Sequence, residues 1–153
     1  MLFRSAGNKV RLKYGLVVEC TGCEKDAEGR VTRVLAKAVP DTRSGTPGAD
    51  AVKVKGTITW VGQHDAVAAT AVLYERLFTE AQPEAGGRDF RSVLNPKSRQ
   101  VARAFVEPAL AGAQREQHWQ FERLGYFVAD RVDHAPGKPV FNRITALRDG
   151  WSA

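Results

Sequence analysis

Apolar and polar residues alternate along much of this chain with a period of two, not with the three-to-four spacing of a helix. Between residues 10 and 20 (VRLKYGLVVEC), apolar side chains take every second position, and Arg11, Lys13 and Glu19 occupy the opposite face. Successive side chains of a strand point to opposite faces. The pattern therefore predicts a half-buried strand over this segment.

Other segments alternate in the same way and are separated by Gly- and Pro-rich joints. Residues 31–39 follow the turn-forming sequence EKDAEGR and predict a return strand. Residues 52–60 predict a strand with lysine and threonine on its outer face. Two long strands are expected at 119–132 and 140–147, joined by DHAPGKP.

Two segments, residues 66–78 and 98–108, fit either a helix or a strand. The acidic, Pro/Gly-rich stretch 79–89 is the best internal boundary. Many short strands, few helical patterns and Gly/Pro-rich joints together predict an all-β fold of antiparallel β-barrels.

Composition narrows the class of protein only slightly. The 153 residues are 43% hydrophobic, enough for a packed core, and carry 23 Lys and Arg against 17 Asp and Glu. A net charge of +6 suits a polyanionic partner such as RNA. No apolar run reaches the ~20 residues that span a bilayer, and the first residues lack the apolar stretch of a secretory signal. We therefore expect a cytoplasmic protein without a membrane association.

No constellation of residues predicts catalysis or a metal site. Cys20 and Cys23 stand at a metal-like spacing, but zinc needs two further ligands, and only scattered histidines remain, at 64, 118 and 134. We interpret Cys20 as the end of an apolar strand face and Cys23 as a turn residue, with zinc or redox use as the alternative. Nucleophile, phosphate-loop and metalloprotease motifs are absent.

The stretch 118–127, HWQFERLGYF, places Gln120 and Arg123 among aromatic rings. Rings, amides and guanidinium groups are the groups that stack and pair with unstacked RNA bases. A separation of three puts the two side chains on opposite faces of a regular strand, so a shared ligand requires a bulge or a strand end.

A second candidate is basic. Arg4, Lys9, Arg11 and Lys13 follow one another closely, and the last three share a predicted strand face at intervals of about 7 Å. Such a row suits a nucleic-acid backbone, although a solvated outer face is an equally good interpretation.

A series of segments then resembles a known family. They come in the same order as in the C-terminal part of the glutaminyl-tRNA synthetases, in their bacterial form, a family of class I aminoacyl-tRNA synthetases. The segments are VRLKYGLVVEC, EKDAEGRVTRV, VKVKGTITWV, LYERLF, NPKS, FVEP, QFERLGYF and KPVFNRITALRDGW. The resemblance covers residues 9–151.

The resemblance implies a fold and a binding site. The family's C-terminal region is a pair of β-barrels of the ribosomal 5S-RNA-binding-protein type that binds the anticodon of glutamine tRNA. Its anticodon contacts correspond here to Arg11, Lys13, Gln120 and Arg123, and more loosely to Arg4, which stands one residue out of register. Lysine at position 13 replaces the family's usual arginine, which weakens a planar two-point base contact there.

The resemblance also implies what lies outside this chain. The ATP-binding HIGH and KMSKS-like motifs are absent, so we expect no catalysis, cofactor or metal here, and ATP and magnesium only for the full enzyme with its N-terminal catalytic domain. Residues 1–79 are expected to form a distal barrel and residues 85–153 the later strands of an incomplete proximal barrel. Exposed strand edges then predict dimerisation, strand exchange or partial disorder. The alternatives are a free-standing RNA- or ribosome-binding protein of this fold and a protein-interaction module.

Overall fold

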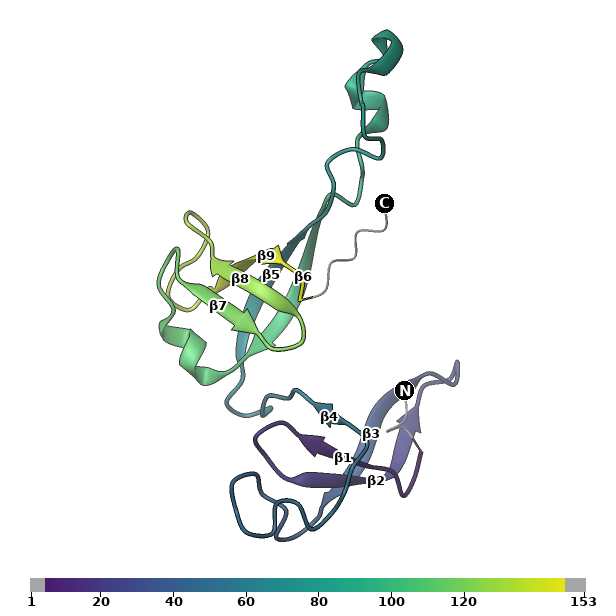
Figure 1. The fold of residues 1–153 in the computed structure, drawn as a ribbon, viewed down its shortest axis with the longest axis vertical. Coiled ribbons are helices and arrows are strands. Elements are labelled where there is room, and N and C mark those ends of the chain that lie inside the picture. Colours follow the sequence, from purple (N-terminus) through teal and green to yellow (C-terminus); the bar gives the residue numbers. More distant parts are fainter. Residues whose placement is uncertain (1–4, 148–153) are drawn as a thin grey trace. The chain divides into compact units, whose positions relative to one another are not determined.

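The structure is a computed structural model that describes residues 5–147, and Arg4 therefore lies outside the described residues. It is all-β, as the alternation predicts, with two sheets and short 3-10 helices (Figure 1). The chain divides into two compact units, Met1–Trp60 and Val61–Ala153, which we call unit 1 and unit 2.

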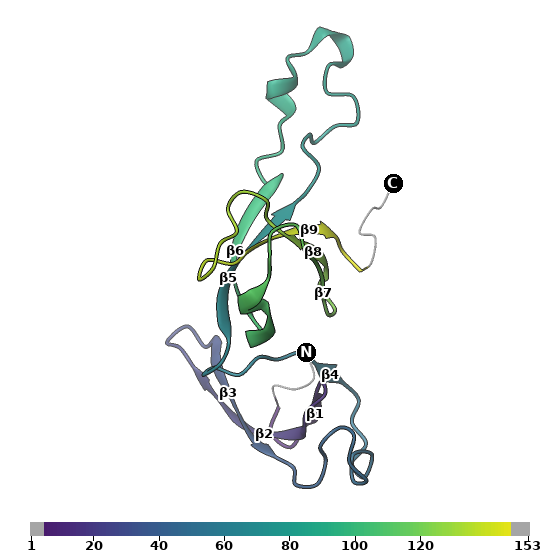
Figure 2. The ribbon, with the colours of Figure 1, turned by 90° about the vertical axis from the view of Figure 1, so that its left-hand side faces the viewer.

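Unit 1 holds a four-stranded sheet of order β3-β2-β1-β4. Its strands are β1 (Lys9–Leu12), β2 (Val17–Lys25), β3 (Val31–Ala38) and β4 (Thr57–Ile58). Figure 2 shows β2 and β3 continuing beyond β1 as a two-stranded ribbon, because β1 pairs only with the first residues of β2. Strand β3 confirms the predicted return strand, whereas of the strand predicted at 52–60 only two residues pair.

The single strand predicted over residues 10–20 is wrong, because the chain reverses in the middle of it. Tyr14 adopts the left-handed conformation (φ 59°), and the amide of Leu12 donates to the carbonyl of Leu16 at 2.9 Å. The segment is therefore a hairpin of β1 and β2, whose two strands each continue the alternation that suggested one strand. Cys23 lies within β2 and not in a turn, and both cysteines are free thiols.

Unit 2 holds a five-stranded sheet of order β6-β5-β9-β8-β7. Its strands are β5 (Val67–Tyr74), β6 (Arg99–Val106), β7 (His118–Phe121), β8 (Gly125–Ala129) and β9 (Val140–Thr145). The 3-10 helices are η2 (Ala85–Gly87), η3 (Phe90–Val93) and η4 (Pro108–Gly112). The segments that fit either helix or strand are thus the paired strands β5 and β6. The fully buried Phe141 lies at the centre of the core, packed against Phe127 and the alanines of β5.

The long strand predicted at 119–132 is also a hairpin. Strands β7 and β8 pair antiparallel with Gln120 opposite Tyr126, and the chain turns between Phe121 and Gly125. Rings of Phe121 and Phe127 stack with centroids 4.3 Å apart, which holds the hairpin against the core. As in unit 1, alternation continued across the turn and hid it.

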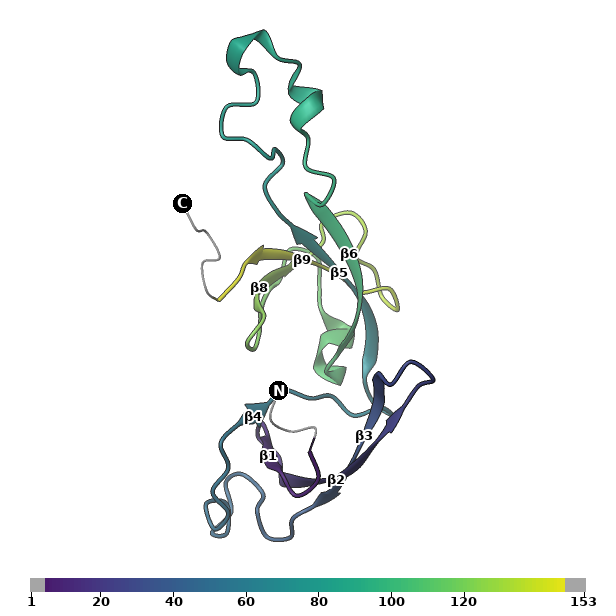
Figure 3. The same cartoon turned by 90° about the vertical axis from the view of Figure 1, so that its right-hand side faces the viewer.

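The units divide at a different place from the boundary expected around residues 79–85. Strand β5 pairs along its whole length with β6 and also with β9, so it belongs to unit 2. The Pro/Gly-rich stretch lies in an arm, residues 75–98, that projects from the ends of β5 and β6 (Figure 3). The division falls earlier, after Trp60, because β5 pairs with strands of unit 2. The arm suggested a boundary because its Pro- and Gly-rich composition resembles that of a linker between domains.

Neither ladder closes on itself within residues 5–147. The edge strands are β3 and β4 in the first sheet and β6 and β7 in the second. Most pairs are antiparallel, as predicted, but β1 pairs parallel with β4, and β5 with β9. An open second sheet is consistent with the expected incomplete barrel, whereas the first sheet is open where a complete barrel was expected.

Candidate nucleic-acid interface

The β7–β8 hairpin presents Gln120 and Arg123 to solvent. Gln120 lies on the face of the hairpin opposite Trp119, Phe121 and Phe127, which pack on the core. Arg123 follows the end of β7, in the turn, so the face rule for a regular strand no longer separates it from Gln120. Arg123 thus stands after the strand end that a shared ligand requires, and the shared ligand itself stays a prediction.

Backbone geometry fixes this turn. The amide of Leu124 donates to the carbonyl of Phe121 at 2.9 Å, and Arg123 takes a left-handed φ of 64°. Gly125 has φ 148°, and a Cβ atom there would come within 2.3 Å of the carbonyl oxygen of Thr145. Glycine is therefore required where the hairpin passes β9, and this close approach fixes where the turn sits on the sheet.

The surface beside Gln120 is aromatic and apolar. Tyr126 lies opposite Gln120 and is 46% exposed, and Leu124 in the turn is 61% exposed. Trp119, in contrast, packs against the core. Of the Trp, Phe and Tyr rings in this stretch, Tyr126 is the one that is exposed.

A polar cluster joins the end of β8 to β9 and to the loop that follows β8. His134 is buried, and its Nδ1 and Nε2 lie 3.2 and 2.9 Å from the backbone of Val140 and Ala113. Asp130, directly after β8, accepts from the amides of Asp133 and Val132 and from the amide group of Asn142. Hydrogen bonds from the Asp133 amide, Asn142 and Val132, with the charge of His134 last, lower the pKa of Asp130 below its ordinary value.

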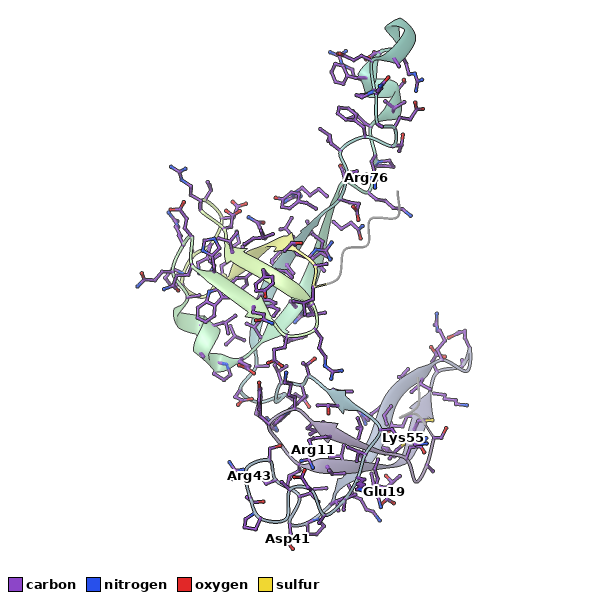
Figure 4. All side chains as sticks on the ribbon, in the orientation of Figure 1. Arg11, Glu19, Asp41, Arg43, Lys55 and Arg76 are labelled. Atoms are coloured by element: carbon purple, nitrogen blue, oxygen red, sulfur yellow. The ribbon has the colours of Figure 1, made fainter. Side chains whose placement is uncertain are left out.

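Arg11, on β1, holds a loop of unit 1 in place. Its guanidinium donates to the carbonyl of Thr42 at 2.8 Å and to the carbonyl of Ala49. Figure 4 shows Arg11 beside the loop that carries Asp41 and Arg43. Thr42 is itself buried, and its hydroxyl accepts from the amide of Val17 and donates to the carbonyl of Val39.

The row of cations expected along one strand face is divided among three settings. Lys9 forms an ion pair with Glu19 at 3.4 Å, Arg11 is half-buried against the loop, and Lys13 lies in the β1–β2 turn. An open hollow of about 420 Å³ lies beside Arg11 and is lined also by Asp50, Val52, Lys53 and Val54.

The β1–β2 turn places an exposed tyrosine beside a lysine and a tryptophan, which the alternating pattern did not predict. Lys13 Nζ lies 5.2 Å from the ring centroid of Tyr14, and Tyr14 is 75% exposed. Trp60 donates its Nε1–H to the carbonyl of Lys13 at 3.0 Å. The sequence predicted Trp60 only as the last residue of a strand at 52–60 and gave no sign of this contact, because nothing local in the sequence relates positions 13 and 60.

Residues 5–147 hold no cluster of metal ligands and no helix that could cross a membrane. There, no three or more His, Cys, Asp or Glu side chains gather in a way that could hold a metal ion. Within the same residues, no helix has the length and apolar character needed to cross a membrane.

Comparison with known proteins finds a family whose model covers the β7–β8 hairpin. Residues 57–130 match the model of the anticodon-binding domain of the class I tRNA synthetases (E and Q). The match includes β7, the turn and β8, and so contains both Gln120 and Arg123. The two-sheet fold and this match define an anticodon-binding domain of a class I synthetase.

The most similar relatives specify the family further. The chain is 59% identical over 145 residues to a glutamine–tRNA ligase of Ralstonia pickettii, and 61% identical over 145 residues to that of Cupriavidus taiwanensis. Each alignment covers 95% of this chain and 25% of the relative. The glutamine–tRNA ligase of Bordetella pertussis is 55% identical over 147 residues, again with 25% of its length covered. The chain belongs to the bacterial glutamine–tRNA ligase family, as its anticodon-binding region, and spans about a quarter of the relatives' length.

Proposed function

We propose that this chain binds the anticodon loop of glutamine tRNA for a glutamine–tRNA ligase. The observation that carries the proposal is the β7–β8 hairpin, with an exposed Gln120 on β7 and an exposed Arg123 in the turn, inside the segment matched by the anticodon-binding family. Anticodon bases are unpaired and can be splayed out, so their pairing edges are readable by side chains.

Gln120 and Arg123 have the chemistry of base readers. An amide can donate and accept against one pyrimidine edge, while a guanidinium offers two parallel donors to a guanine or a phosphate. By analogy with base readout in DNA, each good contact discriminates by roughly 1–3 kcal/mol. We assign the reading of the anticodon to these two side chains.

Arg11, Lys13 and Arg4 are proposed as further RNA contacts. Lys13 supplies a charge at an exposed turn. Arg11, on β1, is proposed to contact RNA beside the loop that it holds, with part of its guanidinium engaged by that loop. Because lysine is a point charge, we propose a phosphate contact for Lys13 in place of base reading.

The rest of the reaction belongs to the longer enzyme. We propose that this chain is non-catalytic, that ATP, magnesium and glutamine are used by the N-terminal catalytic domain of the same enzyme, and that the enzyme works in the cytoplasm. The chain's own part is to select the tRNA.

Fluorescence anisotropy with glutamine tRNA transcripts tests the proposal. We expect specific binding that weakens when the middle anticodon base is changed and that falls steeply with salt, since phosphate contacts release counterions. Gln120→Ala and Arg123→Ala should each reduce affinity for the cognate anticodon by about 5- to 100-fold and relax base preference. Arg131→Ala, an exposed arginine outside the hairpin, is the matched control.

Two results would contradict the proposal. If the wild-type chain bound all anticodons equally, the chain would be a general RNA binder. If both hairpin variants kept the affinity and base preference of the wild type, the assignment of the readers would be wrong.

A further inference from the structure

The β1–β2 turn exposes a tyrosine in a backbone conformation that tyrosine rarely adopts. Tyr14 has φ 59° and is 75% exposed. Glycine or asparagine normally occupies such a position, because a bulky side chain is strained there. Strained residues of this kind gather at functional sites. Core packing does not account for the ring, since three-quarters of the residue faces solvent.

A second aromatic ring lies along the backbone of the same turn. Trp60 donates its Nε1–H to the carbonyl of Lys13, the residue before Tyr14. A Cβ atom on Gly15, the residue after Tyr14, would lie 3.4 Å from Cζ2 of the Trp60 indole. The indole therefore follows the turn closely and remains 49% exposed.

The loop that Arg11 anchors also holds the turn. The carbonyl of Gly15 accepts from the amide and from the hydroxyl of Ser44, each at 3.0 Å. Two neighbouring segments, one carrying Trp60 and one carrying Ser44, thus fix the turn. A ring presented on a fixed turn loses little conformational entropy when a ligand stacks on it.

Positive charge accompanies the rings. Lys13 Nζ lies 5.2 Å from the centroid of the Tyr14 ring. Exposed aromatic rings beside a cation are the arrangement that binds single-stranded nucleic acid, since rings stack on bases and the cation attracts the phosphate.

We propose that Tyr14 and Trp60, with Lys13, form a stacking site for one unstacked nucleobase of the RNA. The site belongs to unit 1, whereas the Gln120–Arg123 hairpin belongs to unit 2. The proposal rests on the proposed function and extends it: the hairpin reads a base by its edge, while this turn holds another base by its face. Stacking accepts any base, so the site adds affinity and not base preference.

Anticodon stem–loop RNAs of glutamine tRNA with 2-aminopurine at one loop position at a time provide the test. Stacking on an aromatic ring quenches 2-aminopurine fluorescence. The full 153-residue chain is compared with Tyr14→Gly, which removes the ring and suits the left-handed backbone. Tyr14→Phe keeps the ring, Trp60→Ala removes the second ring, and Tyr74→Ala removes an exposed tyrosine of unit 2 as a control.

We expect the wild-type chain to quench one loop position most strongly. Tyr14→Gly and Trp60→Ala should lose that quenching and bind roughly 5- to 100-fold more weakly, with base preference retained. Tyr14→Phe and Tyr74→Ala should behave as the wild type.

The outcomes separate this inference from the function on which it rests. If the wild type binds and discriminates anticodons while Tyr14→Gly keeps full quenching and affinity, the stacking site is wrong and the proposed function stands. In that case the exposed rings of Tyr14 and Trp60 would be assigned to contact with a protein partner. If the wild type binds no stem–loop, the proposed function and the stacking site both fail.

Discussion

At the scale of single residues, the site depends on backbone positions that only certain side chains fit. Gly125 and Gly48 are both close to a carbonyl oxygen of another segment: a Cβ atom would come within 2.3 Å of Thr145 O at the first and 2.1 Å of Asp41 O at the second. Both glycines lie beside proposed RNA contacts. Steric exclusion at these positions therefore shapes the turns that present the functional groups.

Gly48→Ala is expected to destabilise unit 1 by about 1–3 kcal/mol, because the added methyl group forces the loop away from Asp41. Urea unfolding followed by the amide signals of β1 and β2 measures this. Gly22→Ala is the control, since the nearest atom to a Cβ there is 4.0 Å away. Equal stability of the two variants would contradict the prediction.

The depressed pKa of Asp130 makes the stability of unit 2 depend on pH. The unfolded carboxyl binds its proton more tightly than the folded one, so stability rises with pH across this range. The contribution of Asp130 is complete above the ordinary carboxyl pKa of about 3.9 and is lost as the pH falls through the lower, folded value. The difference in urea midpoint between wild type and Asp130→Asn, measured from pH 6 to pH 3, should shrink on acidification. A constant difference would rule out this cause.

At the scale of elements, short turns and one anchored loop position the candidate site. Both hairpins, β1–β2 and β7–β8, reverse at a non-glycine residue in the left-handed conformation, Tyr14 and Arg123. Each of these residues is exposed and carries a group that suits RNA. The loop of residues 41–51 adds a third element, whose place is set by Arg11.

Arg11→Lys tests whether that loop depends on the guanidinium. Lysine carries its donors on one nitrogen and cannot reach the carbonyls of Thr42 and Ala49 together as the forked guanidinium does. We expect a loss of about 1–3 kcal/mol in unit 1 and faster hydrogen exchange at the amides of Ala49 and Ala51. Lys9→Ala, which removes a surface ion pair on the same strand, should change stability by less than about 1 kcal/mol. Unchanged hydrogen exchange in Arg11→Lys would show that the loop keeps its conformation without the guanidinium.

At the scale of the whole molecule, open sheets leave strand edges for association. Strand β6 is an edge of the second sheet, and its Val101 and Phe105 are 58% and 54% exposed. Unpaired edges with apolar side chains attract further strands. The expected dimerisation or strand exchange thus has a physical site at β6, and it remains a prediction.

Val101→Lys is expected to weaken self-association, because a charge on an edge strand opposes pairing with another edge. Sedimentation velocity over a range of concentrations should give a lower mean mass for this variant than for the wild type. Val132→Lys is the control, since Val132 is 75% exposed and lies outside the strands. If the wild type were monomeric at every concentration, the predicted self-association through β6 would be wrong.

The sequence by itself determined the fold class, the family and several of the strand-forming segments. Alternation of apolar and polar residues is a local property of a strand and does not depend on which strand it pairs with. Strands β3 and β9 were therefore predictable from their own residues. The order of motifs was sufficient to identify the glutamine–tRNA ligase resemblance that the family comparison confirms. The basic and aromatic composition of the candidate interface was visible in the same way.

Only the tertiary structure decided where the strands turn, where the units divide and how the side chains are shared. A hairpin with alternation on both strands looks like one long strand, so the turns at Tyr14 and Arg123 were hidden. The division between units depends on the pairing of β5 with β6 and β9, which joins residues far apart in sequence. The engagement of Arg11 with Thr42 and of Trp60 with Lys13 likewise spans 31 and 47 positions. Hydrogen bonds between distant segments leave no local trace in the sequence, and these are the contacts that position the proposed RNA-binding groups.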